Sequence, residues 1–115
     1  MGIVVYGIKN CDTMKKARDW LEARGVPYYF HDYKVAGIDT TTLENWCERV
    51  GWEVLLNRAG TTFRALPDKD KQHLNEARAI QLMVENPSMI KRPVVEHDGK
   101  LIVGFKPERY EAAFG

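Results

Sequence analysis

Cysteine is scarce in this chain of 115 residues, which contains only Cys11 and Cys47. Two cysteines are too few for a disulfide scaffold, and together with three histidines they do not suggest a zinc site. We therefore predict no bound metal and a reducing compartment.

Long apolar runs are also missing, because no stretch approaches the roughly 20 apolar residues of a membrane span, and the first residues lack a signal-peptide pattern. The sequence thus predicts a cytoplasmic protein that does not bind membranes.

An excess of charge of either sign is absent as well. The 17 lysines and arginines nearly balance the 16 acidic residues, and the net charge is +1, so no broad positive surface for nucleic acid or anionic lipid is expected. The apolar fraction of 44% and the charged fraction of 29% are those of an ordinary folded protein. The length fits one compact domain. We predict no nucleic-acid partner, and any anion site must be local.

The first third of the sequence has the pattern of a strand, a helix and a second strand. A β-branched and aromatic run at residues 3–6 predicts a buried central strand that Gly7 closes. Apolar residues at helical spacing predict an amphipathic helix from about residue 12 to 24. The aromatic-rich run at residues 28–33 predicts a second strand beside the first. These elements form a βαβ unit, which is right-handed almost without exception.

The middle of the chain, at about residues 36–90, is mainly helical in pattern, so we predict an inserted helical region. Helices are predicted at about residues 40–50, 52–56 and 75–84. Residues 57–62 have the composition of a surface loop.

Strand patterns return in the last quarter of the chain. Two runs at residues 93–96 and 101–105 flank an Asp-Gly pair, which is a strong hairpin signal. Pro107 then stands where a short closing helix begins. The order is a βαβ unit, a helical insert and a ββα unit with a proline opening the third strand. We therefore predict an α/β protein with a thioredoxin-like (glutaredoxin-like) fold, in which residues 1–115 form a single domain.

Cys11 follows the first predicted strand, where the next helix begins. Unpaired backbone N–H groups and the positive end of the helix dipole stabilise a thiolate there, so the pKa of Cys11 should be lowered. Lys9 and Lys15 would add to this effect if their side chains turn toward the sulfur. Asn10 and Thr13 supply further donors near the sulfur, or only cap the helix. The alternative for Cys11 itself is a small buried hydrophobe.

The second cysteine, Cys47, has a different setting. It shares one helical face with Leu43, Trp46 and Val50, and we predict that it is a core residue. Residues 11–14 contain no second thiol, so a dithiol cycle cannot close there. A thiol from outside the chain must therefore resolve any adduct at the first cysteine, and glutathione is the abundant candidate in a reducing cytoplasm.

Two basic stretches could complete a site around this thiol. Arg92 precedes Pro93, and a cis bond between them would turn the backbone toward a peptide-like ligand while the guanidinium reaches an anion or carboxylate. The alternative is that Lys91 and Arg92 are a solvated basic pair. Lys106 is either a further cation of the site or an exposed side chain. The three histidines lie on different predicted elements, which gives no support to a Cys-His nucleophile or a metal site.

Five segments of the chain match a known pattern: residues 6–13 (Tyr-Gly-Ile-Lys-Asn-Cys-Asp-Thr), 15–17, 55–57, 60–64 and 90–93 (Ile-Lys-Arg-Pro). Together they resemble the arsenate reductase (ArsC/Spx-like) family, and in particular its small YffB-type branch. The resemblance runs from near residue 3 to about residue 112. It implies a thioredoxin-like fold with a helical insertion. It also implies a glutathione-dependent thiol reductase that uses one nucleophilic cysteine through a mixed disulfide.

The resemblance also implies which residues act. Cys11 is the nucleophile, glutathione is a co-substrate rather than a bound cofactor, and glutaredoxin is a further candidate partner. The predicted substrate or glutathione contacts are Lys9, Asn10, Thr13, Arg58, Arg92, Pro93 and Lys106.

Two other functions stay open. In the glutaredoxin-linked arsenate reductases of this family, arginines from three segments hold the oxyanion at the cysteine. Cys11 and Arg92 match two of those positions, whereas Arg58 is displaced and Lys106 stands where the third arginine would be. The Spx-like regulators resemble the same fold but are non-enzymatic and act by contacting RNA polymerase.

Overall fold

The computed structural model describes residues 2–115, which form two compact units. The first unit runs from the N-terminal segment to Ala36 and again from Arg92 to Gly115, and the second unit covers Gly37–Lys91. The expectation of a single domain with a helical insertion at about residues 36–90 stays a prediction. No helix among the described residues has the length and apolar character needed to cross a membrane.

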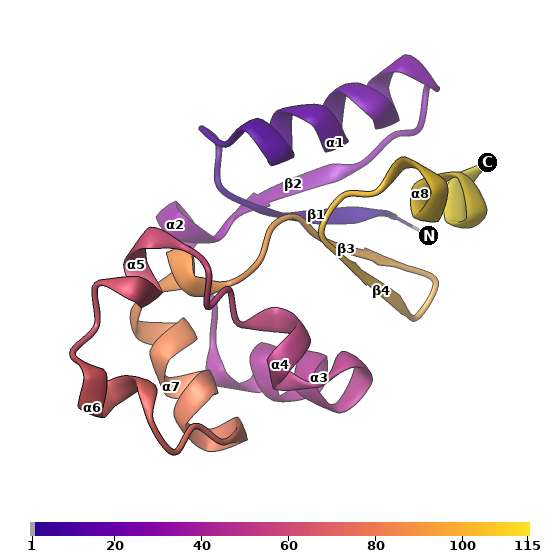
Figure 1. Ribbon diagram of the computed structural model, residues 1–115. Helices are drawn as coiled ribbons and strands as arrows, with labels where there is room; N and C mark the ends of the chain where they lie inside the picture. Colours follow the sequence, from indigo (N-terminus) through magenta and orange to yellow (C-terminus); the bar gives the residue numbers. More distant parts are fainter. Residues whose placement is uncertain (1) are drawn as a thin grey trace. The chain divides into compact units, whose positions relative to one another are not determined.

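A four-stranded sheet forms the centre of the first unit (Figure 1). Its strands are β1 (Val4–Gly7), β2 (Tyr29–Asp32), β3 (Val94–His97) and β4 (Lys100–Val103). The strand order is β2-β1-β3-β4, in which β1 pairs parallel with β2 and antiparallel with β3, and β3 pairs antiparallel with β4. The prediction that the first strand is central is therefore confirmed.

Three helices complete the first unit: α1 (Asp12–Ala23), α2 (Tyr33–Ala36) and α8 (Pro107–Phe114). One apolar core joins α1 and α8 to a face of the sheet, and burying it is the main stabilising contribution to this unit. The buried members of this core are Ile3, Val5, Met14, Ala17, Trp20, Leu21, Val95, Ile102 and Tyr110.

The connections of the first unit agree with the predicted fold. The β3–β4 hairpin turns through Asp98 and Gly99, both at positive φ (49° and 76°), as a two-residue type I′ turn requires. The Arg92–Pro93 peptide bond, which leads into β3, is cis. This arrangement of a βαβ unit and a ββα unit is the predicted thioredoxin-like fold, and that prediction is confirmed.

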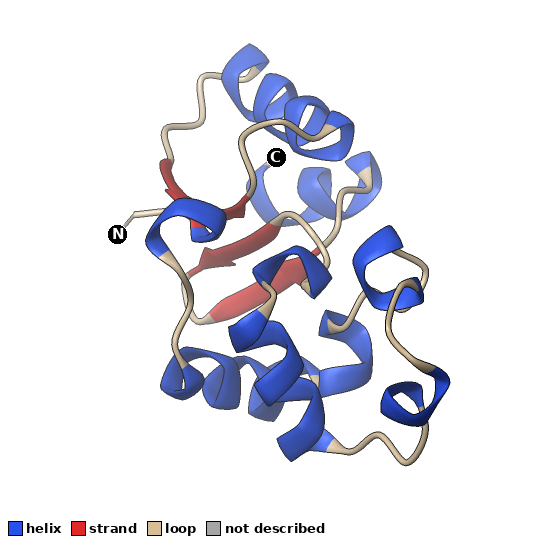
Figure 2. Cartoon of the chain, turned by 90° about the vertical axis from the view of Figure 1, so that its left-hand side faces the viewer, coloured by secondary structure: helices blue, strands red, loops and turns tan. Residues whose placement is uncertain are grey.

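The second unit consists of helices and connecting loops (Figure 2). Its helices are α3 (Thr40–Val50), α4 (Trp52–Leu55), α5 (Thr61–Arg64), α6 (Asp68–Lys71), α7 (Glu76–Glu85) and the 3-10 turn η1 (Pro87–Met89). Asp39 and Asn75 cap α3 and α7, because their side chains accept hydrogen bonds from backbone N–H groups of the first turns. An isolated bridge pairs Leu56 with Ile90.

Some sequence-based expectations were wrong. Tyr33 was expected in the second strand but begins α2, because the Asp32 side chain accepts hydrogen bonds from the N–H groups of Lys34 (3.0 Å) and Val35 (3.3 Å) and so starts a helical turn. Residues 61–62 were expected in a loop but begin α5. The single turn α6 was not predicted, since four polar residues carry no apolar periodicity.

Candidate functional site

Cys11 is the N-cap residue of α1, with an extended backbone (φ −151°, ψ 130°). Its carbonyl oxygen accepts the first hydrogen bond of the helix, from the N–H of Lys15 at 2.9 Å. The N–H groups of Thr13 and Met14 lie near the sulfur and favour its ionised form, although neither makes a hydrogen bond of full strength to it. The sequence thus places the thiol at the positive end of a 12-residue helix, as predicted.

Arg92 brings a full positive charge to the same sulfur. Its Nε donates a hydrogen bond to Cys11 Sγ over 3.4 Å. Burial alone would raise the pKa of the Cys11 thiol, but the N–H of Met14, the Arg92 guanidinium and the N–H of Thr13 together outweigh it. The net effect is a lowered pKa, which increases the thiolate fraction at neutral pH. The predicted direction of the shift is confirmed.

Tyr33 is a site residue that sequence reasoning missed. Its side chain is completely buried at the start of α2 and forms a hydrogen bond with Arg92. Burial raises the pKa of Tyr33 far above its ordinary value, so the hydroxyl stays neutral and accepts from the guanidinium. Arg92 is therefore held between the Tyr33 hydroxyl and the Cys11 sulfur. The Asp32 cap was the available sequence signal that Tyr33 leaves the strand.

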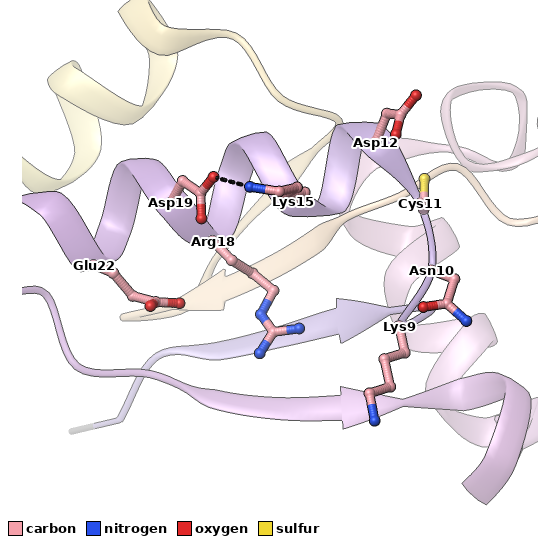
Figure 3. Close-up of a pocket in the computed structure, with 8 residues that line it drawn as sticks. All are labelled: Lys9, Asn10, Cys11, Asp12, Lys15, Arg18, Asp19 and Glu22. Atoms are coloured by element: carbon pink, nitrogen blue, oxygen red, sulfur yellow. Dashed lines mark hydrogen bonds and ion pairs between the residues drawn. The ribbon is translucent and has the colours of Figure 1, made fainter.

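A cleft of about 520 Å³ opens beside the sulfur and follows α1 (Figure 3). Residues of the preceding loop and of one side of α1 line it: Lys9, Asn10, Cys11, Asp12, Lys15, Arg18, Asp19 and Glu22. Three of these side chains are cationic and three are acidic, so the cleft as a whole is close to electrically neutral. It offers room for a ligand extending away from Cys11 along the helix.

The two lysines considered for lowering the thiol pKa lie elsewhere. Lys15 forms an ion pair with Asp19 at 2.9 Å and is directed along the helix, away from the sulfur (Figure 3). The Lys9 side chain extends toward the end of β2 and also away from the sulfur. The cation at the thiol is therefore Arg92, whereas Lys9 is available to a ligand in the cleft.

The other predicted contacts of the first unit are less closely tied to the sulfur. Asn10 lines the cleft and is exposed, and Thr13 is exposed with only its backbone N–H near the thiol. Pro93 is buried beyond its cis bond with Arg92. Lys106 is exposed at the N-cap of α8. Ligand binding by these residues stays a prediction.

Arg58 lies in the second unit, between α4 and α5. Its guanidinium carbon is 5.7 Å from the centroid of the Trp52 ring, a distance at which a cation is attracted to the ring face. Its predicted contact with a ligand stays a prediction.

Cys47 is a core residue, as predicted. It lies in α3 and is 5% exposed. Burial, together with the negative charges of Glu76 and Glu44, raises the pKa of Cys47 to about 11. A thiol in this state is a poor nucleophile at neutral pH, so the two cysteines differ in reactivity. Among residues 2–115, no three His, Cys, Asp or Glu side chains group as a metal site.

Comparison with known proteins supports the family resemblance. The model of the ArsC family matches residues 6–113. A solved structure of an arsenate reductase (ArsC) related protein from Brucella melitensis is 60% identical, with 99% of this chain and 95% of that chain covered and a TM-score of 0.80. A solved YffB protein is 58% identical, with 98% and 99% covered and a TM-score of 0.95.

Curated relatives extend the comparison to other roles. A protein of Haemophilus influenzae is 45% identical over 112 residues, which are 97% of this chain and 98% of the relative. The global transcriptional regulator Spx 2 of Lactococcus lactis is 25% identical over 112 residues, which are 96% of this chain and 84% of the regulator. Proteins named for reduction and for regulation are therefore both similar in sequence to this chain.

Proposed function

This chain belongs to the ArsC family, and we propose that it is a glutathione-dependent thiol reductase whose nucleophile is Cys11. The observation that carries the proposal is the hydrogen bond from Arg92 Nε to Cys11 Sγ, at the N-terminus of α1. The guanidinium and the helix terminus both stabilise negative charge on the sulfur. A stabilised thiolate beside an open cleft is the arrangement that thiol–disulfide exchange requires.

The reaction proceeds through a mixed disulfide. The Cys11 thiolate attacks one sulfur of a substrate disulfide, so that a new S–S bond forms to Cys11, the substrate S–S bond breaks and the other substrate sulfur leaves as a thiolate. A glutathione thiolate then attacks the sulfur bound to Cys11 and restores the Cys11 thiolate. When the bound group is itself glutathione, the products are the freed substrate thiol and glutathione disulfide. No resident cofactor is needed, because the thiols supply both electrons.

The ligand-binding part of the proposal assigns cations to the carboxylates of glutathione. Lys9 and Asn10 line the cleft and lie within the segment that ends at Cys11. Lys106 is a further candidate for carboxylate contacts, and Thr13 and Pro93 are candidates for contacts with the peptide part. A reducing cytoplasm would supply glutathione, and glutaredoxin is a candidate partner for the second step.

Arsenate reduction is the second candidate within the same chemistry. A guanidinium held against a thiolate also suits an incoming oxyanion. Arg92 would bind arsenate while the Cys11 thiolate attacks arsenic, so that an S–As bond forms, one As–O bond breaks and that oxygen leaves, protonated, as water. The relative from Brucella melitensis is described as related to arsenate reductase. In this case glutathione, with glutaredoxin, would complete the cycle.

A regulator that binds another protein without catalysis is the candidate of a different class. The relative from Lactococcus lactis is named as a global transcriptional regulator. For such a protein, the pairing of Cys11 with Arg92 would have no catalytic use.

Two measurements separate these candidates. The protein is incubated with glutathione disulfide, and intact mass spectrometry is expected to show one added glutathione per chain. The adduct should vanish in Cys11→Ser and persist in Cys47→Ser, which is the matched control. An absence of adduct in the wild-type protein would contradict the reductase proposal. Turnover of arsenate with glutathione and glutaredoxin then decides between the two enzymatic functions.

A further inference from the structure

Arg18 is a cleft side chain whose orientation is held by two contacts. It extends from α1 toward β1 and β2 (Figure 3). Its Nε donates to the Tyr28 hydroxyl at 3.0 Å, and its guanidinium carbon lies 4.7 Å from the centroid of the Phe30 ring. Tyr28 in turn donates to Glu22 at 2.6 Å. Tyr28 therefore fixes the Nε edge of the guanidinium, and the Phe30 ring covers one of its faces.

The outer edge of this guanidinium is available to a ligand. The two terminal amino groups of Arg18 have no hydrogen-bond partner among residues 2–115. Two parallel N–H donors in a rigid plane match the two oxygens of a carboxylate. Because Tyr28 and Phe30 already order the side chain, binding would cost little additional side-chain entropy.

The position of Arg18 relative to the thiol limits the size of the ligand. Arg18 follows Cys11 by seven residues, which places both on nearly the same side of α1, about 10 Å apart along the helix axis. A peptide residue spans at most about 3.6 Å. About three residue lengths therefore join a sulfur reacting at Cys11 to a carboxylate at Arg18.

The charges around Arg18 favour a single carboxylate over a strongly charged anion. Asp19 and Glu22 also line the cleft, and their negative charges oppose the approach of a polyanion. Asp19 is paired with Lys15, and Glu22 accepts from Tyr28. A peptide end with both an ammonium and a carboxylate group would meet complementary charges here.

We propose that Arg18 binds a carboxylate of the disulfide that reacts at Cys11 and thereby selects peptide-like disulfides over uncharged ones. This inference rests on the proposed thiol-reductase function. It adds a specificity residue that the sequence pattern did not indicate, since Arg18 resembles an ordinary solvated charge on an amphipathic helix.

The first test compares two disulfides at single turnover. The rate constant of mixed-disulfide formation at Cys11 is measured for glutathione disulfide and for the uncharged 2-hydroxyethyl disulfide. In Arg18→Gln the ratio of the two constants is expected to fall about tenfold, the low end for a hydrogen bond between charged groups. Tyr28→Phe should give a smaller fall, because the guanidinium loses its fixed partner. Lys16→Ala, an exposed residue of α1 outside the cleft, should leave the ratio unchanged.

An unchanged ratio of rate constants in Arg18→Gln would overturn the inference, whether both rate constants stay the same or both fall by the same factor. Circular dichroism at the assay temperature checks that each variant is folded.

A second test avoids any reaction at the sulfur. Binding of S-methylglutathione, which cannot exchange with Cys11, is measured by titration calorimetry and should weaken about tenfold in Arg18→Gln. If wild-type protein binds this compound through Arg18 but forms no mixed disulfide, only the proposed reductase function fails. Equal binding by both proteins, or no binding by the wild type, would overturn the role of Arg18.

Discussion

The Nε atom of Arg92 donates a hydrogen bond to the sulfur of Cys11 across 3.4 Å, although 81 positions separate the two residues in the sequence. Cys11 lies a few residues beyond the end of β1, and Arg92 lies just before β3. Because β1 and β3 pair antiparallel, with Tyr6 opposite Val94, the end of one strand lies beside the start of the other. The sheet register therefore creates the contact between cation and thiol.

Removing this cation should make the thiol less acidic. The pKa of Cys11 is lowered against the opposing effect of burial, so the midpoint of its alkylation rate against pH should lie below that of a free cysteine. In Arg92→Gln the midpoint should move up, and the rate near pH 7 should fall severalfold because less thiolate is present. Lys91→Gln, the exposed neighbour, serves as the matched control. A midpoint that does not move in Arg92→Gln would show that the guanidinium does not control the thiol.

The lowered pKa of Cys11 also predicts how stability depends on pH. A group whose pKa is depressed by folding stabilises the protein fully above its unfolded pKa, and this contribution is lost as the pH falls through the folded pKa. The difference in melting temperature between wild type and Cys11→Ser should therefore grow as the pH rises from the folded pKa to the unfolded pKa of the thiol, and level off above the unfolded pKa. Thermal unfolding at a series of pH values measures it. If the difference in melting temperature instead shrinks as the pH rises, folding does not lower the pKa of Cys11.

The reactive thiol could be predicted from sequence because its setting is local. The strand pattern before Gly7 and the helical spacing after Asp12 are sufficient to place Cys11 where α1 begins. The contact with Arg92 is not local, because it requires the pairing of β1 with β3. Tyr33 was missed for another reason: an aromatic run favours a strand, and the competing cap at residue 32 ends the strand one residue earlier.

Arg18 shows a further limit of sequence reasoning. Its helical position predicts a solvated charge, and only the contacts with Tyr28 and Phe30 at β2 reveal an ordered guanidinium. Such contacts depend on how α1 packs on the sheet, which apolar periodicity indicates only for the buried face.

The two cysteines should differ sharply in reactivity. Cys47 is buried and its pKa is raised to about 11, whereas Cys11 is half-buried with a lowered pKa. A chromogenic disulfide at pH 8 should therefore titrate one thiol rapidly in the folded protein and the second only after denaturation. Cys11→Ser should show no rapid phase, and Cys47→Ser should keep it. Two rapid equivalents in the native wild type would contradict the burial of Cys47.

Loss of the Tyr33 hydroxyl should affect the site through Arg92. In Tyr33→Phe the guanidinium loses a partner, so it should hold the thiolate less well and the Cys11 alkylation midpoint should rise, by less than in Arg92→Gln. The free energy of unfolding should fall by about 1 kcal/mol, the typical contribution of one hydrogen bond. Tyr110→Phe is the matched control, since that buried hydroxyl donates to the Gly104 carbonyl at 3.1 Å. If both variants lose stability but neither changes the midpoint, Tyr33 has only a structural role.

Packing beneath the first turn of α1 offers a test of how the fold positions the thiol. Gly7 ends β1, and a Cβ atom there would clash with the sulfur of Met14, whose side chain is fully buried. In Gly7→Ala the Met14 side chain must move, at a cost of about 1–3 kcal/mol for overpacking a core. Because the N–H of Met14 lies near Cys11, the first turn should shift and the alkylation rate of Cys11 near pH 7 should fall.

Chemical denaturation measures the loss of stability, and alkylation kinetics measure the change at the thiol. Gly2→Ala is the control, since no atom lies within 4 Å of an added Cβ there. A Gly7→Ala protein that is destabilised yet alkylated at the wild-type rate would show that the thiol does not depend on this packing.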